Sequence, residues 1–400
     1  MTTESGADET TEPEVDAAEL VARARELAPL LRENAEKTEQ DRRVAEEVVT
    51  ALRDAGLFRL TTPTRFGGYG LGERMTDVIS VIFEVGQACT STAWNISIDT
   101  ASTKFAVDGL PETALAEVFA DGPDAYVSSM ASLATTRASR VDGGYVVTGT
   151  YPWSSGCEIA DWGYMPATQI FDGDEPTTDI VGVVAPASDL KIERTWTSTG
   201  LAGSGTHTVI AEDLFVPEHR AVAYSLNDFA DEDQRDTTLI QGSAQSLAAT
   251  VGAAQGALEY TREVLGKGRS ISFTTYAAAS DAASVQLWFA EATHLIETAR
   301  LHLAEVGRSL DGVPGAQPVS WAERARIRRH EVSAHEKARA GVEKLIDIVG
   351  GSAFAAASPL QRFWRDMAVA SRHNAVNAPI IAEDYGRALL NVRPTVTLIY

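Results

Sequence analysis

The stretch VDGGYVVTGTYPWSSGCEIADW, residues 141–162, is where the hydrophobic pattern of the chain changes from helical spacing to the alternation of β-strands. It opens with Val141-Asp142-Gly143-Gly144-Tyr145, which is typical of a tight turn, and continues in a β-rich run. Further strand-like runs follow at residues 180–184 and 207–216. We therefore expect a small β domain over residues 121–225.

The residues before this domain, 17–120, have helical spacing. Apolar residues recur every three or four positions between Asp41, an expected N-cap, and Gly56, an expected helix stop. The same spacing returns between residues 75 and 89. This part of the chain is predicted to be an N-terminal helical domain.

The residues after the β domain, 226–400, are helical again. Four long segments joined by short breaks predict a four-helix bundle; they lie near residues 241–267, 280–311, 320–349 and 358–390. The expected fold is thus α+β, with helices, a β domain and a helix bundle in chain order.

Composition excludes several classes of function. The 400 residues carry 34 Lys and Arg against 56 Asp and Glu, a net charge of −22 without a basic cluster, so a nucleic-acid partner is not expected. No run is apolar enough to span a membrane, and an acidic N-terminus differs from a secretory signal, so we expect a soluble, cytoplasmic protein. Residues 1–16 are predicted to be a disordered acidic tail. The two cysteines favour buried thiols over a disulfide or a zinc site.

Three segments carry the residues best suited to chemistry. They are YPWSSGCEIADW at 151–162, WTSTGLAGSGTHTVIAEDLFVP at 196–217, and PLQRFWRD at 359–366 followed by Ser371-Arg372-His373. In this order they resemble the two-component flavin-dependent monooxygenases of the acyl-CoA dehydrogenase superfamily. The resemblance extends from about residue 20 to residue 390. Members of the family that this chain resembles are the oxygenase component of p-hydroxyphenylacetate hydroxylase and dibenzothiophene monooxygenase.

This resemblance implies a central β-barrel, a homodimer or homotetramer, and reduced FAD or FMN supplied by a separate NAD(P)H:flavin reductase. It also implies hydroxylation of an aromatic, indolic or polycyclic small molecule, as in natural-product biosynthesis, through a flavin C4a-hydroperoxide formed with molecular oxygen. The glycine run at 200–205 leads into a strand, whereas a dinucleotide fingerprint leads into a helix, so NAD(P)H is not expected to bind this chain.

The resemblance also assigns residues to the site. A serine near flavin N5 matches Ser155, with Ser154 as the other candidate, and Trp153 matches an apolar wall beside the ring. By themselves the two serines are typical of a turn before a glycine. His373 matches a histidine that assists hydroperoxide formation or proton delivery. Further flavin contacts match Ser128, Ser129, Thr206, Arg269, Gly350 and Gly351, although the last two equally fit a plain helix stop.

Two positions depart from the family pattern. Relatives with phenolic substrates carry a histidine where this chain has residues 99–104, which contain none, so an indole, a polycyclic molecule or a heteroatom is as plausible a target as a phenol. Ala202 replaces an arginine of the glycine-rich loop, and the choice between FAD and FMN stays open.

Two alternatives to a monooxygenase remain. An acyl-CoA dehydrogenase needs a catalytic glutamate, but one family position for it falls near Gln245-Ser246 and the other, a Tyr-Glu-Gly-Thr loop, is missing. A noncatalytic flavin-binding paralogue would be indifferent to His373→Ala and Ser155→Ala. The segment HEVSAHE, residues 330–336, spaces its histidines five apart, which does not suit a metal, and it is expected to be a solvated charged helix.

Overall fold

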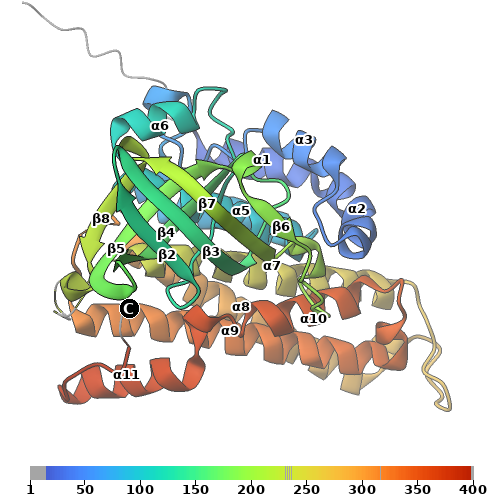
Figure 1. Ribbon diagram of the computed structural model, residues 1–400. Coiled ribbons are helices and arrows are strands. Elements are labelled where there is room, and N and C mark those ends of the chain that lie inside the picture. Colours follow the sequence, from blue (N-terminus) through green and yellow to red (C-terminus); the bar gives the residue numbers. More distant parts are fainter. Residues whose placement is uncertain are drawn as a thin grey trace, which may run out of the picture.

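A computed structural model describes residues 15–229, 231, 233, 235, 237–315 and 317–397. Helices, a sheet and a second set of helices follow one another along the chain, as Figure 1 shows in blue, green and orange. The expected α+β class is confirmed. Most of the predicted tail, residues 1–14, lies outside the described residues. Asp16, its last residue, caps the first helix by accepting a 2.9 Å hydrogen bond from the Ala18 N–H.

Six helices form the N-terminal layer. They are α1 Ala17–Glu26, α2 Ala28–Asp41, α3 Glu46–Asp54, α4 Met75–Gly86, α5 Thr90–Gly109 and α6 Glu112–Val118. The expected N-cap at Asp41 is wrong, because Asp41 is the last residue of α2 and Arg42 ends that helix with a φ of 54°. The next helix begins only at Glu46.

Helix α5 is the element of this layer that builds the site. It is buried on nearly all sides, because it packs against both α7 and the sheet, and so it lacks the polar face of a surface helix. Its polar side chains bond across these contacts. The Thr100 hydroxyl donates to Gln245 Oε1 of α7 at 2.5 Å, and the Val127 N–H of β1 donates to Asp99 Oδ1 at 2.9 Å.

The central sheet has eight strands. Its hydrogen-bonded order is β6-β7-β3-β2-β4-β5-β8, with β1 paired to β4. The strands are β1 Val127–Ser129, β2 Thr136–Val141, β3 Gly144–Ser154, β4 Trp162–Asp172, β5 Glu175–Pro186, β6 Lys191–Glu193, β7 His207–Pro217 and β8 Ala221–Ser225. The pairing of β3 with β7 is irregular between Tyr151 and Ser154. Such a bulge bends the strand locally and changes the direction of its side chains.

The C-terminal helices lie beneath the sheet (Figure 1). They are α7 Thr238–Gly266, α8 Ala283–Leu310, α9 Trp321–Val349, α10 Pro359–Ala370 and α11 Ala378–Leu390. The single helix expected over 358–390 is wrong: residues 371–377 interrupt it. Asn377 accepts from the Ile380 N–H and Pro379 fits the first turn, so a second helix begins there.

The prediction of a solvated helix at residues 330–336 is also wrong. Helix α9 packs against α7, α8, α10 and α11, so its inner face has no access to water. Glu331 and His335 lie on that face and are buried. In the described part of the chain, no helix combines the length and apolarity that a membrane crossing requires.

Candidate functional site

Two adjoining cavities lie where the sheet meets the helices. Their volumes are about 360 Å³ and 220 Å³, and both are lined by Trp94, Trp153, Ser155, His373 and Asn374. Helices α5 and α7 supply most of the remaining wall of the larger cavity, and the end of β1 also contributes to it. The loop before β7 and the end of α10 complete the smaller one. The structure therefore brings Ser155 and His373 to the same space, although 218 positions separate them in the sequence (373 minus 155).

The hydroxyl of Ser155 belongs to a directed chain of hydrogen bonds. Ser204 Oγ donates to the Leu201 carbonyl oxygen at 2.7 Å, so its remaining contact, with Thr206 Oγ1 at 2.6 Å, is one that it accepts. The Thr206 proton is then used, and its 2.8 Å contact with Ser155 must be donated by Ser155. The indole N–H of Trp94 in turn donates to Ser155 Oγ at 3.1 Å.

This direction decides what Ser155 can bind. Its proton is committed to Thr206 and one lone pair accepts from Trp94, so one acceptor lone pair is left on an atom at the cavity wall. The wall therefore offers an acceptor to a ligand N–H or O–H group.

His373 lies in the break between α10 and α11, not on a helix as its sequence context suggested. It caps the short turn Asn374–Val376, and its Nδ1 accepts from the Ala375 N–H at 3.3 Å. The neutral ring therefore carries its proton on Nε2. The ring is open to the cavity but surrounded by protein on its other sides, and this partial burial lowers its pKa. His373 is thus a neutral N–H donor near pH 7.

Trp94 joins the two predicted catalytic residues. Besides its bond to Ser155, its ring meets the His373 ring edge-on with centroids 5.7 Å apart. Such an edge-to-face contact holds an aromatic ring in one orientation. Trp94 was not singled out from the sequence, because only the fold brings α5 against the turn after β3.

Trp153 is held in a strained backbone conformation. Its φ is 60°, a region that residues other than glycine rarely adopt, and 67% of the residue is exposed. A large apolar side chain in such a position is a frequent mark of a ligand contact. The bulge in β3 thus presents the indole to the cavity as an open wall.

We expect Trp153→Asn to separate ligand binding from folding. Asparagine tolerates a positive φ better than tryptophan, so the melting temperature should not fall. Loss of the indole wall should weaken flavin binding about tenfold, the equivalent of about 1.4 kcal/mol. Thermal unfolding and a fluorescence titration with FAD and FMN would check both expectations; an unchanged flavin affinity would show that the indole is not a flavin contact.

The remaining predicted residues take different places. Thr206 lines the smaller cavity and Ser129 the larger one. Ser128 is buried behind them and donates to the Ser155 carbonyl oxygen at 2.9 Å, so it supports the loop. Ser154 turns away from the cavity and donates to the Tyr151 carbonyl oxygen at 3.0 Å. Of the two serines that the sequence left open, Ser155 is the one at the cavity wall.

Arg269 and the glycines Gly350 and Gly351 form a separate group. Arg269 Nη1 donates to Ser352 Oγ at 3.0 Å, which joins the segment after α7 to the end of α9. Gly350 ends α9 with a φ of 71°. None of the three lines the two cavities, so the group would meet only a ligand that extends beyond them.

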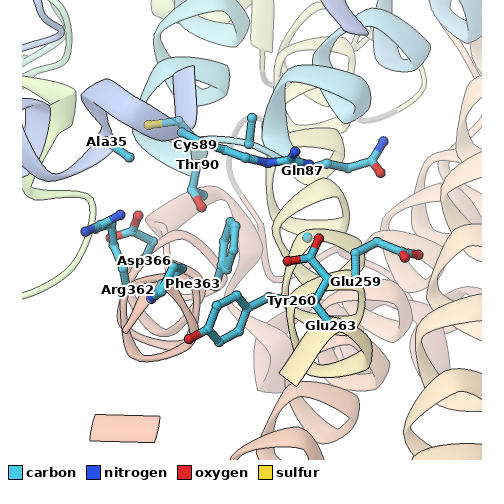
Figure 2. A pocket seen from close by; sticks show the side chains of 14 residues that line it. Ala35, Gln87, Cys89, Thr90, Glu259, Tyr260, Glu263, Arg362, Phe363 and Asp366 are labelled. Atoms are coloured by element: carbon cyan, nitrogen blue, oxygen red, sulfur yellow. The ribbon is translucent and has the colours of Figure 1, made fainter. Parts of the chain in front are cut away.

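A further cavity of about 260 Å³ lies between α2, α7 and α10, shown in Figure 2. Cys89, Phe363 and Asp366 are among its lining residues. Asp366 Oδ1 accepts from the Leu201 N–H at 2.7 Å and so fixes the loop that lines the smaller of the two adjoining cavities. Burial raises the pKa of Asp366 to about 7. Within the described ranges, His, Cys, Asp and Glu side chains form no group of three or more that could hold a metal ion.

Two family models match this chain, one in its N-terminal helices and one in its C-terminal helices. Residues 16–109 match the family "Acyl-CoA dehydrogenase, N-terminal domain" and residues 245–378 match "Acyl-CoA dehydrogenase, C-terminal domain". A solved structure of XiaF from Streptomyces sp. in complex with FADH2 and glycerol is similar, with a TM-score of 0.87 and 29% identity. The match covers 96% of this chain and 97% of XiaF.

The curated relatives that are more than 30% identical include two with different printed functions. The oxygenase subunit HsaA of Rhodococcus jostii, a flavin-dependent monooxygenase, is 34% identical over 88% of this chain and 93% of the relative. The oxygenase component of an FADH2-dependent resorcinol hydroxylase of a Rhizobium species is 31% identical over 94% of this chain and 95% of the relative. The resemblance expected from the sequence is confirmed, and the chain belongs to the family of two-component flavin-dependent monooxygenase oxygenase subunits with the acyl-CoA dehydrogenase fold.

Proposed function

We propose that the two adjoining cavities hold the ring system of reduced FAD or FMN together with a neutral aromatic, indolic or polycyclic substrate, which the enzyme hydroxylates. The observation that carries this proposal is the pairing of an acceptor, Ser155 Oγ, with a neutral donor, His373 Nε2, on one cavity wall. When bound, reduced flavin supplies the two electrons that are needed to place one atom of molecular oxygen in the product and to release the other as water.

The residues present fit a reduced flavin. The free lone pair of Ser155 matches an N–H donor, and N5 of a flavin bears a hydrogen in the reduced form only. Trp153 and Trp196 offer apolar surface beside that acceptor. Arg269 and the loop at Gly350 suit the phosphate and adenine of FAD, which supports FAD over FMN.

The roles of the chain's own residues follow from their chemistry. His373 donates or relays a proton through Nε2, because Nδ1 is occupied by the backbone. Trp94 holds both His373 and Ser155 in place. The indoles of Trp94 and Trp153 narrow the space that water can occupy, which limits wasteful release of hydrogen peroxide.

The lining of the larger cavity supports the substrate class. It combines the apolar side chains of Trp94, Ile98, Phe105 and Leu239 with serine hydroxyls, and none of the described residues that line it is Asp, Glu, Lys or Arg. A flat, neutral molecule can enter without stripping water from a fixed charge. The absence of a carboxylate among these residues also argues against the dehydrogenase alternative, which needs a base beside its substrate.

Two further components belong to the proposal. A separate NAD(P)H:flavin reductase supplies reduced flavin, and both enzymes act in the cytoplasm, where NAD(P)H is available. The chain forms a homodimer or homotetramer through its exposed apolar side chains, among them Phe273, Leu287, Trp288 and Leu301. Light scattering would report the mass of the assembly, and a monomer would contradict this part.

The function is tested by mixing protein and anaerobically reduced FAD with oxygenated buffer in a stopped-flow spectrometer. We expect an absorbance transient before oxidised flavin returns, and it should decay faster when an aromatic substrate is present. Mass spectrometry should find one atom of 18O in the product when labelled oxygen is used. Immediate return of oxidised flavin with stoichiometric hydrogen peroxide, with every aromatic substrate tried, would refute the proposal.

The pH profile should reflect the neutral state of His373. Because burial lowers its pKa below the ordinary value of 6.5, the neutral ring prevails at every pH above 6.5. Below its pKa the ring binds a second proton at Nδ1 and loses its bond from Ala375. We therefore expect product formed per reduced flavin to be level above pH 6.5 and to fall only in more acidic buffer. An acid limb centred above that value would contradict the assignment.

A further inference from the structure

The wall of the larger cavity contains a serine that is bonded to a buried acid. Ser243 of α7 lines the cavity, and its hydroxyl lies 2.7 Å from Glu331 Oε1 of α9 and 3.0 Å from the Ile240 carbonyl oxygen. The shorter contact, to the carboxylate, is the one over which the hydroxyl donates. Glu331 is completely buried, and among the described residues its second oxygen, Oε2, has no hydrogen-bond partner. Ser243 thus lies between the buried carboxyl group of Glu331 and the larger cavity.

A structural role explains this arrangement poorly. A buried carboxyl oxygen without a hydrogen bond destabilises the fold, and an apolar side chain of similar size would avoid that cost. Burial raises the pKa of Glu331 to about 7, so the group exchanges a proton near neutral pH. Such a group is suited to proton transfer, provided that a hydroxyl connects it to a ligand.

Two groups near Glu331, Ser243 and Arg328, favour its ionised form and partly offset the larger, opposite effect of burial on its pKa. Arg328, nearly one turn earlier on α9, lowers the pKa of Glu331 and donates to the Ala375 carbonyl oxygen at 3.0 Å, beside the His373 turn. His335, one turn later, is kept neutral by burial, with a pKa of about 3. From α7, Ser243 adds its hydrogen bond to the carboxylate.

We propose that Ser243 and Glu331 form a relay that recognises an O–H or N–H group on the substrate ring and takes its proton during oxygenation. This proposal rests on the proposed function and names the polar group that the substrate must carry. The relay would take the role of the substrate-binding histidine of phenol-hydroxylating relatives. The corresponding residues of this chain, 99–104, contain no histidine. Ser243 is the residue that touches substrate, and Glu331 is a positioning residue that acts through it.

The proton and electron balance is complete for a phenol. The substrate O–H bond breaks as Ser243 Oγ accepts the proton and passes its own to the Glu331 carboxylate. The electron pair left on oxygen enriches the ring, whose carbon would form the new C–O bond with one atom of molecular oxygen as the O–O bond breaks. Bound reduced flavin would supply the two electrons for that cleavage, and the second oxygen atom would leave as water with the proton lost from the ring carbon. Glu331 then returns its proton through Ser243 to the phenolate oxygen.

Recognition is tested without turnover. Protein carrying oxidised FAD is titrated with 2-naphthol and with 2-methoxynaphthalene, which lacks the O–H group, and the two dissociation constants are compared. Wild type should prefer 2-naphthol about tenfold, and Ser243→Ala should remove that preference. Thr250→Val is the matched control, because Thr250 is a buried hydroxyl of the same helix that donates to the Ser246 carbonyl oxygen; it should keep the preference. Equal preference in wild type and Ser243→Ala would overturn the proposal.

Proton transfer is tested with Glu331→Gln, whose amide oxygen can still accept from Ser243. This variant should bind 2-naphthol as wild type does, but it should form about tenfold less hydroxylated naphthol per reduced FAD. Glu331→Asp should recover part of the yield. Wild-type yield in Glu331→Gln would overturn the relay. If wild type discriminates between the probes but yields no oxygenated product, the monooxygenase step fails while recognition by Ser243 stands.

Discussion

Exchange of His373 for alanine is expected to divert the enzyme from product to hydrogen peroxide. Among the residues that the structure describes, the variant loses the one imidazole that lines the two adjoining cavities. A positioned acid or base contributes about 10²–10⁴-fold to rate, so the rate of product formation should fall at least about 100-fold. Oxidation of reduced flavin by oxygen should continue, because it needs no substrate. Product and peroxide, measured together in single-turnover reactions, would give the ratio.

His294 provides the control for this exchange. It is exposed on α8 and lines neither of the two cavities, so His294→Ala should couple flavin oxidation to product as wild type does. His373→Gln should recover little, since an amide can donate a hydrogen bond but does not relay a proton. Normal coupling in His373→Ala would remove the histidine from the mechanism and favour a noncatalytic role for the break.

Replacing Ser155 by alanine should have an effect of similar size through a different cause. The exchange removes Ser155 Oγ, which accepts from the Trp94 N–H and donates to Thr206 Oγ1. It also removes the lone pair that this oxygen offers to a ligand. A buried group left without its partner costs about 1–3 kcal/mol, and here two groups are affected. We expect weaker binding of reduced flavin and mostly peroxide as product. Anaerobic titration with reduced FAD and peroxide assays would measure the two effects.

The neighbouring serine makes this test specific. Ser154 is the last residue of β3, directly before Ser155, and is also buried, but its hydroxyl donates to the Tyr151 carbonyl oxygen away from the cavity. Ser154→Ala should lower the free energy of unfolding by about 1 kcal/mol and leave the yield of product per flavin unchanged. Equal loss of coupling in both variants would mean that the loop acts as a unit and that neither hydroxyl has a separate role.

Much of the fold could be predicted from the spacing of apolar residues. The change of period at residues 141–162 and the long helical segments after residue 240 reflect which faces are buried, and burial leaves its pattern in the sequence. Breaks are harder to predict. Asp41 has a side chain typical of an N-cap yet ends α2, and residues 371–377 contain no glycine or proline to indicate a break although the chain turns there. Such turns depend on packing against distant segments.

Some residues of the candidate site could likewise be named from the sequence, and others could not. Ser155, Trp153, Thr206 and His373 were named because a family resemblance connects them, not because spacing does. Trp94 and the pair of Ser243 and Glu331 were missed, since their contacts join residues 61 and 88 positions apart. The charged run at 330–336 was read as solvated because pattern alone does not reveal that α9 is enclosed by helices on several sides.

The capping bond of His373 has a consequence for how the imidazole is held. Many catalytic histidines are oriented by a carboxylate, which also raises their basicity and places a negative charge nearby. Here a main-chain amide performs the orientation and brings no charge. Side-chain substitutions elsewhere in the protein therefore leave the tautomer unaltered, whereas proline at position 375, which has no amide hydrogen, would release the ring to swap its two nitrogens.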